Sequence, residues 1–434
     1  MLQMIVDFFY IMFQVVLYYI CIQDYKTTFI NICNRIAKIN IFYIKTFQWF
    51  TYDLTNDPVL NEELYEYTSS FCNKVPYDPN DICQETIEYL QNVKNEKGEP
   101  VNTMDKKPIN CGTIALCYKG SMEGKPVIIK ILRKDIHLKL KVFFDQLDFL
   151  FGICQKLENW YFINKGSVSF LKKIIDSSKN DFMKQVDFLQ ECKNIQLFYD
   201  TYEDSSIFRI PMVYSNFTKE NKHVLVMEFL QETYNITNIP KHLIPEYWNH
   251  VLTFMFYGYL AKYLFHCDLH FGNILFMEEN EETKIGIIDF GFIRHVETIP
   301  EQDQLNELWD FILSSVNDET NAAINILLFI KKSYYELNSC PITYAKLNTL
   351  LEEQQTIQRM SGYTTSENHT IVKIILFVLK EQMNIHPVVF STILTLLPFS
   401  GVIKKFNEVN DRKKGVGYNM LLDFKNKVQE FYST

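Results

Sequence analysis

The feature that most constrains this chain is a short polar motif that is followed, after an apolar stretch, by a second acidic motif. His266, Asp268, His270 and Asn273 stand in the sequence HCDLHFGN, and Asp289 opens the tripeptide DFG. Carboxylate and amide oxygens are ligands that Mg²⁺ prefers. Phosphoryl transfer needs positioning and charge neutralisation more than covalent help, and these residue types can supply both. The two motifs at this interval therefore predict a site for phosphoryl transfer.

Each side chain of the two motifs has an expected role. Asp268 is placed to accept or orient a hydroxyl proton. Asn273, five residues later, and Asp289, after an apolar run, are expected to bind the metal ion. Gly291 is expected to let the chain turn sharply after the metal ligand.

Two other interpretations compete for the first motif. One is an ordinary surface loop. The other is a zinc site built on His266 and His270, which would need a third protein ligand at suitable spacing. Cys267 is expected to point elsewhere in so short a loop. The combination with DFG favours the phosphoryl-transfer interpretation.

A lysine at the end of the apolar run VIIK, Lys130, needs a partner, because a buried ammonium is costly unless it is paired. Nucleotide phosphates and a helix glutamate would pair it. Glu191 is the candidate, since Asp187, Glu191 and Asn194 fall on one face of a predicted helix. The alternative for that face is a solvated polar stripe.

The apolar patterning predicts strands among helices. Strands are expected at Lys125–Leu132 and His223–Leu230, and a hairpin at 273–277 and 284–290 with its turn at 278–283. Helices are expected over 23–90, over 135–200, from 240 to the hairpin, and from 300 to the end with a loop near 360–370. The charged residues 92–108 are expected to form a linker. This order predicts an α+β fold with two lobes.

The second strand runs into a polar crossover, which is typical of an adenine-binding hinge. The hinge residues would be Met227, Glu228, Phe229 and Leu230. The alternative is a plain core strand.

The N-terminal segment Met4–Ile22 has 19 residues and one charge, Asp7. As a helix it is about 28 Å long at about 1.5 Å per residue, near the thickness of a bilayer core. It lacks the basic start and small-residue cleavage site of a signal peptide. Three placements stay open: the helix spans a membrane, lies on a membrane surface, or packs on the folded body of the protein. If it spans, the basic residues that follow keep the rest of the chain cytosol-facing. For Pro387–Ile403, with prolines at both 387 and 398, a packed helix is expected.

Composition limits the remaining classes. Hydrophobic residues make up 47% and charged residues 22%, which supports a folded core. The net charge of −9, without a basic block, argues against nucleic acid as a partner. Ten scattered cysteines without a C-x-x-C pair indicate reduced thiols rather than a disulfide or zinc framework.

At this point the motifs resemble those of the UbiB/AarF atypical kinases, a family linked to ubiquinone biosynthesis and lipid homeostasis. His270 separates the first motif from that of typical protein kinases, and Phe290 favours this family over aminoglycoside kinases. The resemblance implies a protein-kinase-like fold with ATP and Mg²⁺ as ligands. It places the nucleotide-binding loop at residues Asn110, Cys111, Gly112 and Thr113. The implied organisation is a hydrophobic helix at 1–24, a helical extension at 25–107, an N-lobe at 108–235 and a C-lobe at 236–434.

The family also has a K-x-G-Q segment that folds over the active site. Lys45 and Gln48 match it here, but Phe47 replaces the glycine. The family's E-x-D element would fall on Gln185 and Asp187, so that its glutamate is a glutamine. Both departures affect the same expected Lys–Glu contact, and we therefore expect autoinhibition to differ in this chain.

Three functions follow. The first is an active kinase or ATPase that acts on or near a membrane lipid or quinone-pathway molecule. The second is a nucleotide-binding scaffold without phosphoryl transfer, for a membrane or protein partner. Retention of Lys130, Asp268, Asn273 and Asp289 argues against the scaffold. A conventional protein kinase is disfavoured, because no A-P-E segment follows Asp289 and residues 292–310 are expected to pass quickly into helix.

Overall fold

The computed structural model describes residues 22–43, 79–93, 103–159 and 182–298, with scattered positions in the rest of the chain. By its internal contacts the chain divides into two compact units. Unit 1 comprises Met1–Lys193 and Met212–Phe229, and unit 2 comprises Asn194–Pro211 and Leu230–Thr434. The division into four segments proposed from the sequence stays a prediction.

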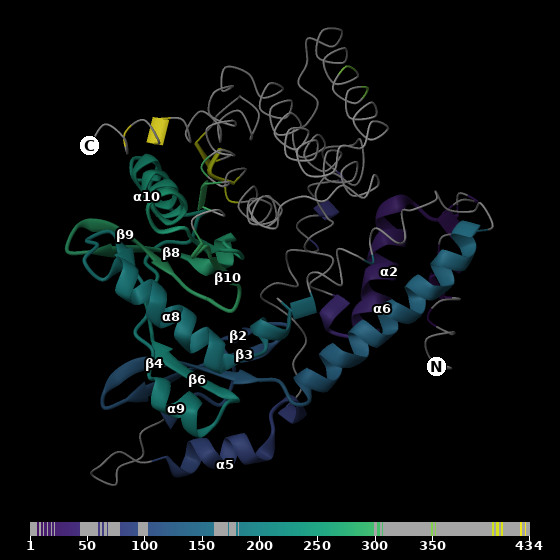
Figure 1. Ribbon diagram of the computed structural model, residues 1–434, viewed down its shortest axis with the longest axis horizontal. Helices are drawn as coiled ribbons and strands as arrows, with labels where there is room; N and C mark the ends of the chain where they lie inside the picture. The colour runs from purple at the N-terminus through teal and green to yellow at the C-terminus, as the bar shows by residue number, and fades with distance from the viewer. Residues whose placement is uncertain are drawn as a thin grey trace. The chain divides into compact units, whose positions relative to one another are not determined.

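Unit 1 contains an antiparallel sheet (Figure 1). Its strands are β1 (Thr103–Met104), β2 (Asn110–Cys111), β3 (Ala115–Met122), β4 (Lys125–Leu132) and β6 (Val224–Glu228). β3 pairs with β1, β2 and β4, and β4 pairs with β6. Glu123 and Gly124 join β3 to β4 with φ of 51° and 78°, the left-handed pair that a two-residue hairpin requires.

The expected strand Lys125–Leu132 is confirmed at both ends, and the one expected at His223–Leu230 is shorter. The linker expected at 92–108 is wrong in part, because Thr103–Met104 pairs with β3. Two-residue strands carry too little pattern to stand out from a linker composition.

The two faces of this sheet differ in character. Val127, Ile129 and Ile131 of β4 lie on one face, within a buried cluster that includes Leu90 and Phe217. Figure 1 shows α5 (Gln84–Asn92) and α9 (Ser215–Glu220) on this side of the sheet. Because side chains alternate along a strand, Lys130 lies on the opposite face.

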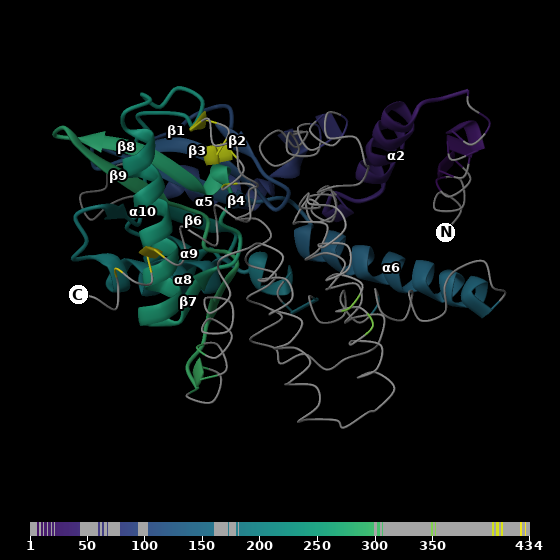
Figure 2. The same ribbon diagram turned by 90° about the horizontal axis from the view of Figure 1, so that it is seen from above.

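Most helices of unit 1 lie in the ranges where helix was expected, but α9 (Ser215–Glu220) lies outside them and α5 ends at Asn92, within the expected linker. The helices inside those ranges include α2 (Tyr25–Ile39), the 3₁₀ turn η1 (Pro79–Asp81), and α6 (Ile136–Asn159), which Figure 2 shows along its length. α8 (Phe188–Tyr202) begins in unit 1 and continues into unit 2.

Unit 2 is built around a small sheet in the order β5-β9-β8. Its strands are β5 (Phe208–Arg209), β8 (Ile274–Glu279) and β9 (Glu282–Ile287). The expected hairpin is present, but its turn is only Asn280–Glu281, with φ of 54° and 67°. α10 (Ile244–Phe256) packs on this hairpin, and the Tyr247 hydroxyl donates to the Met277 carbonyl oxygen at 2.8 Å.

Two short strands lie where helix was expected. β7 (Leu264–His266) follows the π-helix Tyr257–Lys262 and pairs with β10 (Ile293–His295). Uninterrupted helix from 240 to the hairpin was therefore wrong. After β10, Gln302, Asp303 and Asn306 are helical, within the range 292–310 where the chain was expected to pass into helix. Three-residue strands show no period long enough to separate them from a helix.

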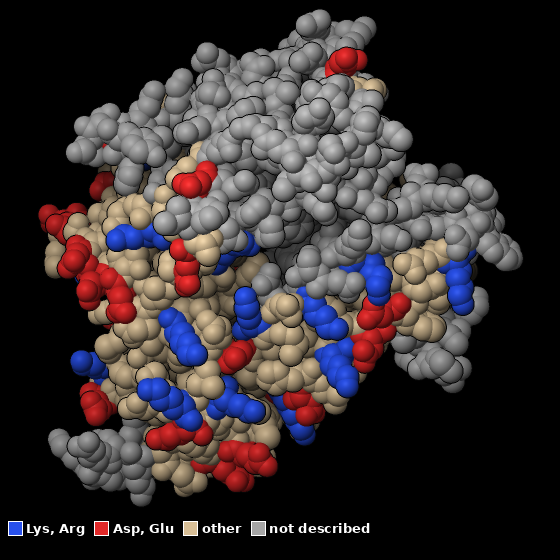
Figure 3. Space-filling model, in the orientation of Figure 1, with Lys and Arg blue, Asp and Glu red and all other residues tan. Residues whose placement is uncertain are grey.

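Several predictions fall on residues that the structure does not describe, including Lys45, Gln48 and all of Pro387–Ile403 except Val402. Within Met4–Ile22, Asp7 is buried and forms an ion pair with Arg35 at 2.6 Å. In the part of the chain that is described, no helix combines the length and the apolar character needed to cross a membrane. On the face shown in Figure 3, acidic and basic side chains are interspersed over the described surface.

Candidate active-site residues

In unit 1, Lys130 of β4 forms an ion pair with Glu191 of α8. The Lys130 Nζ lies 2.6 Å from the Glu191 Oε1. The side chains are 11% and 2% exposed, so both charges are largely removed from water. The Phe188 ring centroid lies 5.9 Å from the same ammonium, within range of a cation–π interaction. The predicted partners thus lie together, and an ammonium held in this way has a fixed position.

The predicted nucleotide loop joins β2 to β3. Asn110 and Cys111 belong to β2, and Gly112 and Thr113 belong to the turn that follows. The Gly112 N–H donates to the Ala115 carbonyl oxygen at 3.0 Å. A Cβ on Gly112 would lie 3.3 Å from that same oxygen, so the tight turn leaves little room for a side chain.

The predicted hinge residues lie at the end of β6. Met227 and Glu228 are in the strand, and Phe229 follows it. The backbone N–H groups of Glu228 and Phe229 donate to Met212 and Pro126 within unit 1. The Phe229 ring lies 4.3 Å from the Lys119 ammonium. Leu230 belongs to unit 2.

In unit 2, His266 fixes the start of the polar loop. Its Nε2 lies 3.1 Å from the Ile288 carbonyl oxygen, which can only accept, so Nε2 carries the proton. Its Nδ1 then accepts from the Asp268 N–H at 3.3 Å. Burial lowers the pKa of His266, a shift that the nearby Asp268 carboxylate opposes. A neutral imidazole therefore positions the backbone of Asp268.

His270 and Asn273 hold the other end of the loop. The His270 Nδ1 accepts from the Gly272 N–H at 3.0 Å. The Asn273 Nδ2 donates to the Asp268 carbonyl oxygen at 2.8 Å. Since the amide nitrogen of Asn273 is used inside the loop, its Oδ1 is the atom suited to a metal ion.

Asp289 has a left-handed backbone, with φ of 64°. Short polar residues such as aspartate tolerate this conformation better than most. The turn expected at Gly291 is present, since Phe290 and Gly291 form a turn, but its glycine does not have positive φ. Phe290, next in the chain, is fully buried and packs on Phe198 with a centroid distance of 4.7 Å.

Backbone hydrogen bonds hold Asp289 beside the polar loop. The Ile288 N–H donates to the Asn273 carbonyl oxygen at 3.1 Å, and the Cys267 N–H donates to the Phe292 carbonyl oxygen at 2.9 Å. Residues on both sides of Asp289 are thus tied to the segment that carries Asp268 and Asn273. Unit 2 brings these three predicted residues into one region.

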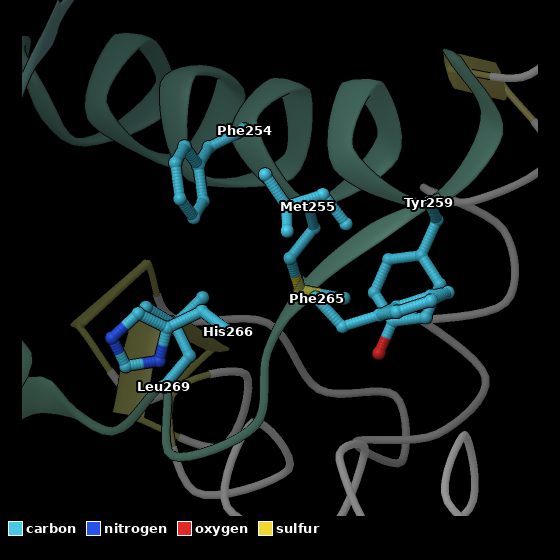
Figure 4. A pocket seen from close by; sticks show the side chains of 7 residues that line it. Phe254, Met255, Tyr259, Phe265, His266 and Leu269 are labelled. Atoms are coloured by element: carbon cyan, nitrogen blue, oxygen red, sulfur yellow. The ribbon is translucent and has the colours of Figure 1, made fainter. Parts of the chain in front are cut away.

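A zinc site at His266 does not fit this geometry, because both of its ring nitrogens bond inside the protein. The described residues also contain no cluster of three or more His, Cys, Asp or Glu able to hold a metal. Beside His266 lies a largely apolar pocket lined by Phe254, Met255 and Leu269, among others (Figure 4). Its volume of about 10 Å³ holds roughly one water molecule.

Of the residues with an expected regulatory role, the structure describes Gln185 and Asp187, which lie at or just before the start of α8. The Asp187 Oδ1 accepts from the backbone N–H groups of Leu189 and Gln190 at 2.9 and 3.3 Å, so Asp187 caps this helix. Gln185 is buried. A regulatory role for either residue stays a prediction.

Asn194 has a role that the sequence did not assign. Its Nδ2 donates to the Phe290 carbonyl oxygen at 2.8 Å, which anchors the segment after Asp289. The sequence feature that pointed to Asn194 was its position on the same helical face as Glu191. A contact to a backbone carbonyl has no counterpart in the sequence pattern, so its target stayed hidden.

The antiparallel sheet with a buried Lys–Glu pair, and the loop tied to a DFG segment, are features of the protein-kinase class. The ABC1 atypical kinase-like domain matches residues 71–327, more than half of the chain. The chain therefore belongs to the ABC1 family of atypical kinase-like proteins, which includes the UbiB proteins, and it has a protein-kinase-like fold.

The relatives that match this chain are distant from it in sequence. "Protein ACTIVITY OF BC1 COMPLEX KINASE 1, chloroplastic" of Arabidopsis thaliana is 26% identical over 63% of this chain and 39% of its own length. "Probable protein kinase UbiB" of Photorhabdus laumondii is 26% identical over 39% of this chain and 31% of its own. The chain thus spans well under two thirds of these relatives.

Among solved structures, the Rv3197–erythromycin complex of Mycobacterium tuberculosis gives a TM-score of 0.43 at 14% identity, covering 73% of this chain and 83% of that one. The Rio2 kinase complex with ADP/Mg²⁺ and phosphoaspartate of Chaetomium thermophilum gives 0.30 at 13% identity, covering 79% and 95%.

Proposed function

We propose that the protein is an ATP·Mg²⁺-dependent atypical kinase or ATPase. The observation that carries the proposal is the loop of Asp268 and Asn273, tied by backbone hydrogen bonds to the segment of Asp289. A carboxylate and an amide oxygen suit a hard divalent cation, and phosphate oxygens with water complete its shell. When bound, Mg²⁺ neutralises charge on the phosphates.

The chain's own residues have distinct roles in this proposal. Lys130, held by Glu191, binds phosphate oxygens of the nucleotide. Asn273 and Asp289 hold the metal ion, and Asp268 orients the attacking hydroxyl or water. Residues Asn110 to Thr113 lie over the phosphates, and the strand end at Met227 to Leu230 contacts the base. Asn194 and His266 keep the DFG segment and the loop in place.

The test is ADP release by the full chain with ATP and Mg²⁺, alongside Asp289→Asn. Loss of a metal ligand should lower turnover by at least about a hundredfold, since removing one group that stabilises the transition state costs that much in enzymes. The matched control is Asp145→Asn, the same chemical change at an exposed position of α6, which should leave turnover unchanged. Equal turnover by both variants would refute the assignment of Asp289.

A finer proposal concerns the acceptor, which we infer to be a lipid or a quinone-pathway small molecule near a membrane. It is supported by the family resemblance alone. ADP release should rise when detergent or lipid vesicles are added.

The alternative is a nucleotide-binding scaffold. It predicts that ATP·Mg²⁺ raises the melting temperature, as a ligand of the native state must, while ADP release stays at the level of Asp289→Asn in every condition.

A further inference from the structure

Arg133 is a buried cation that the proposed function does not yet use. It follows β4 in the chain, and its side chain is 1% exposed. Its Nη1 lies 2.5 Å from the Asp81 Oδ2 in η1, and its Nε donates to the Gly112 carbonyl oxygen at 3.0 Å. One guanidinium therefore connects the N-terminal segment at Asp81 to the turn between β2 and β3.

The backbone supports the same connection. The Arg133 N–H donates to the Ile114 carbonyl oxygen at 3.0 Å, and the Lys134 N–H donates to the Asp81 carbonyl oxygen at 2.5 Å. Two carbonyl groups of the turn, those of Gly112 and Ile114, are thus held by residue 133. Burial lowers the pKa of Arg133, and the Asp81 carboxylate opposes that shift.

The held carbonyl fixes the direction of a peptide group. In a trans peptide the C=O and the following N–H point in opposite directions. With the Gly112 carbonyl directed at Arg133, the Thr113 N–H points away from it. In loops that bind phosphate, N–H groups must face the anion, and a flipped peptide would present a carbonyl oxygen instead.

We propose that Arg133, oriented by Asp81, is a positioning residue that locks the Gly112–Thr113 peptide so that the turn presents its N–H to the nucleotide phosphates. This inference rests on the proposed function and extends it to a contact between the loop and segment 79–81. It requires no contact between Arg133 and the nucleotide.

The experiment compares Arg133→Lys and Asp81→Asn with Tyr89→Phe. Lysine keeps the charge but cannot make both side-chain contacts, and asparagine removes the charge that orients the guanidinium. Tyr89 lies in the same N-terminal segment and donates to the Glu220 carboxylate at 2.9 Å, away from the turn. Its change to phenylalanine loosens that segment without touching Gly112.

We expect the first two variants to raise the KM for ATP about tenfold, as loss of a charged hydrogen bond would, with a smaller change in kcat. They should also shrink the thermal shift caused by ADP·Mg²⁺, whereas Tyr89→Phe changes only the melting temperature. If all three variants lower the melting temperature but leave the KM for ATP as it is in the unmodified chain, Arg133 has only a structural role and the inference is wrong. If Arg133→Lys does not fold, the KM for ATP of Asp81→Asn tests the inference instead.

Failure of the proposed function has a separate signature. If the unmodified chain neither binds nor hydrolyses ATP·Mg²⁺, the proposed function fails, and hydrogen exchange then tests the turn by itself. The Gly112 amide should exchange faster in Arg133→Lys than in the unmodified chain, because its bond to Ala115 depends on the same turn. Unchanged exchange would overturn the inference without any nucleotide.

Discussion

The ion pair between Lys130 and Glu191 is the residue-scale feature with the clearest energetic consequence. Both side chains are largely buried, so each charge depends on the other. Removing one partner of a buried pair costs about 3–5 kcal/mol, because the remaining charge stays in a poor environment, whereas removing both can be nearly neutral.

We therefore expect Lys130→Met to lower the free energy of unfolding by about 3 kcal/mol or more, and Lys130→Met with Glu191→Gln to lower it by less. Urea unfolding of the variants measures both. The control is Lys26→Met, which removes an exposed pair with Glu63, 44% and 45% exposed, and should cost at most about 1 kcal/mol. A double variant less stable than the single one would contradict this account.

The residue scale also shows which contacts the sequence could predict. Lys130 was identifiable because an ammonium in an apolar strand demands a partner, and Glu191 was the glutamate at helical spacing. The roles of Arg133 and Asn194 could not be identified in this way. Arg133 donates to the carbonyl oxygen of Gly112, and Asn194 donates to the carbonyl oxygen of Phe290. Every residue has such a carbonyl, so no residue type marks the target.

At the scale of elements, the β8–β9 hairpin combines good pairing with a costly turn. Asn280 and Glu281 both have positive φ, and the second of these positions favours glycine. The sequence predicted a longer turn, at 278–283, because glutamate is an unusual residue at the second position of a two-residue turn and the tight turn was therefore not recognised.

Glu281→Gly should raise the free energy of unfolding by about 0.5–1 kcal/mol, since glycine adopts a left-handed backbone without steric cost. Glu282→Gly, one position later at the first residue of β9, should instead lower it by at most about 0.5–1 kcal/mol, because glycine loses more conformational entropy in a strand and relieves no positive φ there. Urea midpoints compare the two. A destabilising effect of similar size in both variants would show that the turn stores no strain.

Element length decided how much of the fold was predictable. The eight-residue β4 has an apolar, β-branched run that marks it as a strand, and its last four residues are all buried. β7 and β10, of three residues each, were missed, although their pairing holds the polar loop beside the DFG segment. They are specified by tertiary pairing rather than by local pattern, which a single sequence does not display.

At the scale of the whole molecule, the two buried histidines of unit 2 make its stability depend on pH. His250 contacts Thr283 at 2.9 Å and lies near Glu246 and Lys427, and His266 lies near Asp268 and Asp289. Burial is the main cause that lowers the pKa of both. Their folded-state pKa values thus lie below the unfolded value of about 6.5.

Below about pH 6.5 the unfolded chain binds protons that the folded chain does not, so stability present above that pH is lost as the pH falls toward the folded values. The loss is at most about 1.4 kcal/mol per pH unit for each histidine. Between pH 7 and 5, hydrogen exchange should therefore quicken in α10 and β9 of unit 2 before it does in β3 and β4 of unit 1. Replacing both histidines by glutamine should flatten this dependence, whereas His242→Gln, at an exposed position, should leave it unchanged. Equal acceleration in both units would mean that these imidazoles do not control the acid response.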